Sequence, residues 1–187
     1  MKPTRRSIGG FTLIELIVAI MLIGVLASAL MPLAATSVRA YQASQTRVLA
    51  QDKLRYAMER MSRELREVSY TSASGFDFVG LTTTNPVSSL SFQRTYYGVN
   101  PGNATVTLSF AGSALTLTDS GYTALGAQTL CDTVSSVQFK LLDEAGQVLS
   151  SPSKTNVYAV EIVVLLNANG ANLTQSTTVE LKNRLRV

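Results

Sequence analysis

Residues 11–35 read FTLIELIVAIMLIGVLASALMPLAA, and this stretch decides the fold of the 187-residue chain. From Leu16 to Ala35 no residue is charged, and only Gly24, Ser28 and Pro32 interrupt a series of apolar side chains. A bilayer core of roughly 30 Å needs about 20 apolar residues in a helix, so the stretch is long enough to cross a membrane. A surface helix of a soluble domain would not be apolar on every face. We therefore predict a transmembrane helical segment over residues 11–35.

The positive charges of the chain gather near this segment. Up to Tyr70 there are ten Lys or Arg residues against five Asp or Glu residues, whereas from Thr71 onward there are six against seven. Three of the cations, Lys2, Arg5 and Arg6, precede the apolar stretch, where they indicate that the N-terminus stays on the cytoplasmic side. The net charge of +4 therefore does not require a nucleic-acid groove, and no nucleic-acid partner is expected.

Residues 36–70 predict an amphipathic continuation of the same helix. Apolar residues recur at steps of three and four, at Leu54, Met58, Met61, Leu65 and Val68. Arg and Glu alternate at i,i+4 spacing from Arg55 to Glu67, which predicts a solvated face. No Gly or Pro occurs between Leu33 and Ser74, so we predict one helix from about Thr12 to about Ser69. At 1.5 Å per residue this helix would be about 85 Å long.

Residues 71–187 predict a β-rich globular domain, because the chain becomes rich in Thr, Ser, Asn and Gly and the apolar period changes to two. The expected fold class is α+β: a long N-terminal helix against a twisted, mostly antiparallel sheet. Residues 72–88 and 98–103 give no strand prediction. The predicted strands are Ser89–Tyr97, Ala104–Phe110, a return strand through Leu115 and Leu117, Val134–Leu142, Gln147–Leu149, Tyr158–Leu166 and Thr177–Leu185, with turns at Ala111–Ser113, Asp143–Gly146 and Asn167–Gly170.

The composition gives no support to an enzyme, a metal site or a cofactor. Histidine is absent and Cys131 is the single cysteine, so neither a Cys/His metal site nor an internal disulfide can form. The acids from Asp77 to Glu144 lack EF-hand spacing, and Asp143–Gly146 is better interpreted as a turn. Cys131 is expected to be a buried small apolar group.

The functional motif is the basic leader with Lys2, Arg5 and Arg6, then Gly9-Gly10, then Phe11-Thr12-Leu13-Ile14-Glu15 and the apolar span. It resembles the class III signal of type IV pilins and type II secretion pseudopilins. The resemblance implies that residues 1–10 are a cleaved leader and that an inner-membrane prepilin peptidase cuts between Gly10 and Phe11. It also implies methylation of the Phe11 nitrogen, which keeps the positive charge.

Glu15 carries the physical argument beside this resemblance. A carboxylate in the bilayer costs on the order of 2.5–3.5 kcal/mol on insertion scales, and its own segment offers no basic neighbour. Cleavage after Gly10 creates a cation on Phe11 at the same membrane depth. In a filament of such helices Glu15 of one subunit can pair with the Phe11 ammonium of another, and the low dielectric makes that pairing selective.

Gly24 and Pro32 interrupt the apolar helix. Pro32 removes one amide donor and leaves the Ser28 carbonyl without its helical partner, so a kink or soft place is expected there. In pilins, the stretch between a Gly and a Pro at matching positions is where the helix can melt in the assembled filament. The resemblance thus implies a melting segment from Gly24 to Pro32.

Two further stretches resemble particular members of the family. Residues 54–67 are similar to the same stretch of larger minor pilins and pseudopilins: the J-type pseudopilins of type II secretion, the W-type minor pilins and the O-type minor pilin of mannose-sensitive haemagglutinin pili. Residues 179–184 resemble their closing strand. The implied function is a minor pilin or pseudopilin in, or priming, a type IV pilus or secretion pseudopilus. Its implied partners are the prepilin peptidase, other pilin subunits, the inner membrane before assembly and the inner-membrane assembly platform.

Several alternatives remain. The chain could be a major subunit of the same filament, or a tip-associated adhesin or DNA-uptake module whose cations would be Arg94, Lys140, Lys154, Lys182 and Arg186. Ala27-Ser28-Ala29 also offers an ordinary signal-peptide cleavage site, and a plain signal-anchored periplasmic domain would share the apolar segment. The residue at which the mature protein begins separates these last two from a pilin-like subunit.

Overall fold

The computed structural model describes residues 11–96, 102–121, 126–168 and 170–181. The predicted leader, residues 1–10, lies outside them. The chain divides into two compact units, Met1–Gln45 and Thr46–Val187, and each is described by itself.

One long helix, α1 (Leu13–Arg66), begins within the first unit and ends within the second. The predicted helix is thereby confirmed, and its ends differ from the expected ones by one and three residues. In the first unit every described side chain from Phe11 to Gln45 is exposed. Among the described residues α1 is the one helix long and apolar enough to cross a membrane, with a mean hydropathy of 2.7 over its most apolar 18 residues.

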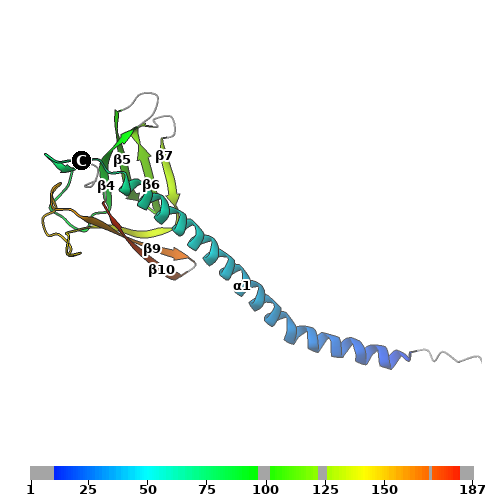
Figure 1. The fold of residues 1–187 in the computed structure, drawn as a ribbon. Helices are drawn as coiled ribbons and strands as arrows, with labels where there is room; N and C mark the ends of the chain where they lie inside the picture. Colours follow the sequence, from blue (N-terminus) through cyan, green and yellow to red (C-terminus); the bar gives the residue numbers. More distant parts are fainter. Residues whose placement is uncertain (1–10, 97–101, 122–125, 169, 182–187) are drawn as a thin grey trace, which may run out of the picture. The chain divides into compact units, whose positions relative to one another are not determined.

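In the second unit the predicted apolar stripe of α1 forms one side of the core. Leu54, Met58, Met61 and Leu65 are buried, and Val68 continues the stripe just beyond the helix. These residues pack in one cluster with apolar side chains of the strands, and this part of α1 lies beside the strands in Figure 1. The stripe therefore has the role that its spacing predicted.

The strands of the described residues form three antiparallel sheets (Figure 1). A five-stranded sheet has the order β3-β4-β5-β6-β7, a three-stranded sheet has the order β10-β9-β8, and β1 pairs with β2. The bounds are β1 Tyr70–Thr71, β2 Gly75–Phe76, β3 Phe78–Val79, β4 Ser89–Tyr96, β5 Gly102–Ala111, β6 Ala114–Asp119, β7 Ala127–Cys131, β8 Val134–Leu142, β9 Ala159–Ala168 and β10 Ala171–Glu180.

The α+β fold class is confirmed, but the expectation of a single sheet is wrong. Only Asp132 and Thr133 separate β7 from β8, yet these strands belong to different sheets. Thr133 has a φ of 60°, a conformation rare for a β-branched residue, and there the chain passes from one sheet to the other. Val87, which lies just before β4, forms an isolated antiparallel bridge with Phe139 of β8.

The individual strand predictions were correct to different degrees. Val134–Leu142 is confirmed at both ends, and β9 lies at the centre of its sheet, as its apolar faces predicted. The last strand begins at Ala171 and not at Thr177, because the turn containing Gly170 is tight enough to pair Ala168 with Ala171. β7 and the short strands β1 to β3 had not been predicted, and the expected residues 182–185 of the last strand lie outside the described part.

Gly75 allows a close approach between two segments that are distant in sequence. The backbone N–H of Phe76 donates to the carbonyl of Lys154 at 2.8 Å. Gly75 has a φ of 79°, and a Cβ there would collide with the same carbonyl group. Both the backbone conformation and the lack of space therefore require glycine at position 75, the first residue of β2.

Candidate functional site

The N-terminal end of α1 carries a capping box formed by Thr12 and Glu15. The backbone N–H of Glu15 lies 3.4 Å from Thr12 Oγ1, and the backbone N–H of Thr12 lies 3.5 Å from Glu15 Oε2. The pattern Thr-x-x-Glu is the sequence signature of this reciprocal cap. The sequence Thr12-Leu13-Ile14-Glu15 itself carries this signature.

This cap fixes where the Glu15 carboxylate lies. The carboxylate points back toward the first residues of the described chain. It lies beside the backbone N–H of Thr12, the residue that follows Phe11. Glu15 is exposed, and a carboxylate can accept more hydrogen bonds than the one from Thr12. A negative charge in the first helical turn is also favoured by the helix dipole. The position can therefore accept a cation from another molecule without losing the cap.

Exposed hydrophobic side chains precede and follow this acid along the chain. Phe11, Leu13, Ile14 and Met21 are each more than two-thirds exposed. Together with the hydropathy of α1, this exposure is consistent with membrane anchoring.

Pro32 lies within α1 and does not end it. Hydroxyl groups around it bond to backbone carbonyls: Ser28 Oγ donates to Val25 at 2.8 Å, Thr36 Oγ1 to Pro32 at 2.8 Å, and Ser37 Oγ to Leu33 at 2.9 Å. Hydroxyls that bond back to helical carbonyls accompany bent or weakened helix segments. A Cβ at Gly24 would meet no atom within 4 Å, so the surrounding space does not require glycine there.

A second polar site lies where α1 faces the five-stranded sheet. Arg94 of β4 forms ion pairs with three carboxylates: its Nη1 donates a hydrogen bond to Glu67 at 2.8 Å and lies 3.2 Å from Glu64 Oε2, and its Nη2 donates to Asp119 of β6. Arg60 pairs with the other oxygen of Glu64 at 2.7 Å. We call these five residues the Arg94 cluster.

The Arg94 cluster corrects the expectation of a fully solvated Arg/Glu face. Arg63 and Glu59 form an exposed pair at 3.5 Å, as expected, but only 2% of the Glu64 side chain is exposed. Burial raises the pKa of Glu64, while the charges of Arg94 and Arg60 oppose the rise. The sequence could not reveal this burial, because Arg94 and Asp119 are far from Glu64 along the chain.

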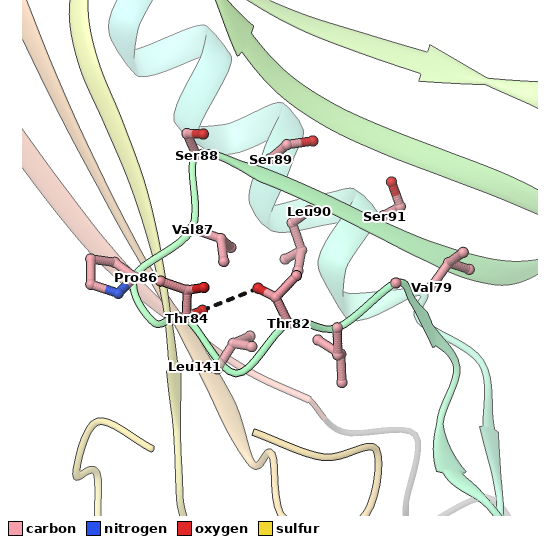
Figure 2. A pocket seen from close by; sticks show the side chains of 12 residues that line it. Val79, Thr82, Thr84, Pro86, Val87, Ser88, Ser89, Leu90, Ser91 and Leu141 are labelled. Atoms are coloured by element: carbon pink, nitrogen blue, oxygen red, sulfur yellow. Dashed lines mark hydrogen bonds between the residues drawn. The ribbon is translucent and has the colours of Figure 1, made fainter. Parts of the chain in front are cut away.

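A cavity of about 600 Å³ opens between the loop after β3 and the start of β4 (Figure 2). Its side chains are apolar or carry hydroxyl groups, such as Leu81, Thr82, Leu90 and Ser91, and Leu141 of β8 closes one side. The hydroxyl of Thr82 donates to the carbonyl of Thr84 at 3.4 Å. None of the described residues that line it is charged.

The other candidate residues in the described part of the β-rich unit are buried or paired with carboxylates. Cys131 is buried and forms no disulfide, and burial raises the pKa of its thiol. Lys140 pairs with Glu161 at 3.0 Å and Lys154 with Asp77 at 3.3 Å, while Lys182 and Arg186 lie outside the described residues. Within the described ranges, no group of three or more Cys, Asp or Glu side chains could hold a metal ion.

Residues 5–31 match a family model described as the prokaryotic N-terminal methylation motif. The matched range includes Gly10, Phe11, Glu15 and Gly24 and ends just before Pro32. No curated protein matches the chain. The match covers a small N-terminal part of the chain, so the β-rich unit is interpreted from its own geometry.

Proposed function

We propose that this chain, whose N-terminal motif supports a type IV pilin-like family, is a minor pilin or pseudopilin subunit. A prepilin peptidase cleaves it between Gly10 and Phe11 and methylates the new Phe11 amino group. The subunit stays in the inner membrane through residues 11–35 until the assembly platform adds it to a filament of related subunits. Its β-rich unit then lies in the periplasm or at the cell surface.

The position of Glu15 is the observation that carries this proposal. Placing an exposed acid of an exposed apolar segment in a membrane costs free energy unless the acid pairs with a cation. The Glu15 carboxylate faces the start of the helix and keeps acceptor capacity beyond its cap. The Phe11 ammonium of a neighbouring subunit has the charge and the membrane depth to pair with it. Before cleavage this ammonium does not exist, so processing and assembly are coupled.

The β-rich unit supports a minor rather than a major role. The chain has one cysteine and therefore lacks a paired C-terminal cysteine loop, in contrast to major pilins.

The cations of the unit at Arg94, Lys140 and Lys154 are paired with carboxylates, which leaves them poorly suited to bind nucleic-acid phosphates.

Gly24 and Pro32 are proposed to bound a segment that melts in the assembled filament. The bond of the Ser28 hydroxyl to the Val25 carbonyl lies inside this segment and supports the proposal, because such a bond competes with the regular backbone ladder. Local melting would let the filament extend under tension.

Substitutions at Glu15 test the proposal. Glu15→Gln keeps an acceptor oxygen for the cap but removes the charge, whereas Thr12→Ala removes the hydroxyl of the cap and keeps the charge. We expect Glu15→Gln and Glu15→Val to be cleaved normally but to be lost from purified filaments, and Thr12→Ala to be incorporated like the wild type. Mass spectrometry of the mature N-terminus measures cleavage, and immunoblotting of sheared filaments measures incorporation. Normal incorporation of Glu15→Gln would exclude the charge pairing, and a mature chain that does not begin at Phe11 would exclude the processing step.

A further inference from the structure

The edges of the two larger sheets differ in how they are protected. An edge strand presents unpaired backbone N–H and C=O groups, which pair readily with another extended chain. Native proteins protect such edges by short strands, bulges, charged or proline residues, or a covering segment. The edge strands here are β3 and β7 in the five-stranded sheet and β8 and β10 in the three-stranded sheet.

Three of these four edges have a visible protection. β3 has two residues, and β7 has five and carries a register irregularity in its pairing with β6. The free edge of β8 is covered by its own chain, because Val87 and Phe139 exchange two backbone hydrogen bonds, of 3.0 and 2.8 Å. Asn85 and Leu149 add hydrogen bonds to Leu141 on the same edge.

Within the part of the chain that the structure describes, the fourth edge, β10, shows no shortening, bulge, proline or covering segment. It runs for ten residues and pairs with β9 in an uninterrupted register from Ala171 to Glu180. Among the described residues, no backbone hydrogen bond other than those of the β9 ladder involves β10. Its sequence ANLTQSTTVE contains no Lys, Arg or Pro, and its only charge is Glu180 at the end. Thr174, Gln175 and Ser176 in the middle are all exposed.

We propose that β10 is a docking edge that accepts an extended strand from an adjoining subunit of the filament. The free backbone groups of β10 favour another extended backbone as the occupant, because its N–H and C=O groups repeat at the spacing of the strand ladder. The exposed Thr and Ser hydroxyls favour an uncharged segment with Thr, Ser or β-branched side chains, which pair well across strands. This inference rests on the proposed function, because it requires neighbouring subunits.

Two lysine substitutions on the same sheet face test the docking edge. Ser176 of β10 and Gln138 of β8 flank the same β9 residue, Val163, and both are exposed. Ser176→Lys places a charge on the open edge, whereas Gln138→Lys places the same charge beside the covered edge. We expect Ser176→Lys to be processed normally but to enter filaments about tenfold less than Gln138→Lys, which should resemble the wild type.

Hydrogen–deuterium exchange provides the direct measurement. The backbone amides of residues 171–180 are expected to exchange at least about tenfold more slowly in wild-type filaments than in the full chain in detergent. Equal exchange in the two states, or equal incorporation of the two lysine variants, would overturn the docking edge and leave the proposed function intact. Absence of the wild-type chain from filaments would overturn both.

Discussion

Arg94→Met should destabilise the β-rich unit strongly, because it removes the cation at the centre of the Arg94 cluster. Arg94 is 11% exposed and holds Glu64 and Asp119, which are 2% and 8% exposed. Methionine keeps much of the length and apolar stem of the side chain but removes the charge and all the hydrogen bonds. Glu64 would keep only Arg60, and Asp119 would keep the backbone N–H of Gly121 but no cation.

The expected cost follows from this burial. Removing one partner of a buried ion pair leaves an uncompensated charge and typically costs about 3–5 kcal/mol. Arg63→Met on α1 is the control with the same chemical change, because the Arg63–Glu59 pair is 3.5 Å long and more than half exposed on both sides. An exposed pair of this kind contributes about 0–1 kcal/mol. The loss in the free energy of unfolding should therefore be several-fold larger for Arg94→Met than for Arg63→Met.

The pH dependence provides a second readout at Glu64. Because burial raises its pKa in the folded state, the folded chain holds the proton to a higher pH than the unfolded chain does. The contribution of Glu64 to stability is therefore most favourable below its ordinary pKa and declines as the pH rises through the raised, folded pKa. Glu64→Gln should remove this decline, so the stability of wild type relative to Glu64→Gln should fall across that pH range.

Chemical denaturation of the full chain in detergent, followed by circular dichroism of the β signal, measures each free energy of unfolding by linear extrapolation. Measurements at several pH values give the slope attributed to Glu64. An Arg94→Met variant that loses no more stability than Arg63→Met would refute the buried-pair reasoning. A wild-type profile parallel to that of Glu64→Gln would refute the assigned pKa direction.

Two further predictions concern Gly75 and Cys131. Gly75→Ala should cost about 3 kcal/mol or more, because a Cβ collides with the Lys154 carbonyl, whereas Gly80→Ala, with a similar positive φ and open space, should cost about 1 kcal/mol in denaturation experiments. Cys131 should react with a thiol reagent far more slowly in the folded chain than in denaturant, because it is buried and its thiol pKa is raised; equal rates would contradict its burial.

Local patterns predicted those features that depend on neighbouring residues alone. The apolar run of residues 11–35 and the stripe through Leu54 and Leu65 follow from helical periodicity, which needs no knowledge of the partner surface. The capping box of Thr12 and Glu15 was also local, and the sequence would have revealed it.

The burial of Glu64 was not predictable in this way. A glutamate at i,i+4 from an arginine has the same sequence pattern whether it faces solvent or a sheet. Arg94 and Asp119 reach Glu64 only because β4 and β6 lie beside α1 in the folded unit. The tertiary packing therefore converts part of an ordinary charged helix face into a buried ion-pair cluster.

The apolar helix with its single acid, the amphipathic continuation and the antiparallel character of the β-rich unit follow from the sequence, because each depends on residues close together in the chain. The division of the strands into two larger sheets, the burial of Glu64 and the open edge of β10 among the described residues are visible only in the folded unit. These features depend on which distant segments meet, since backbone pairing and charge burial are set by neighbours in space rather than in sequence.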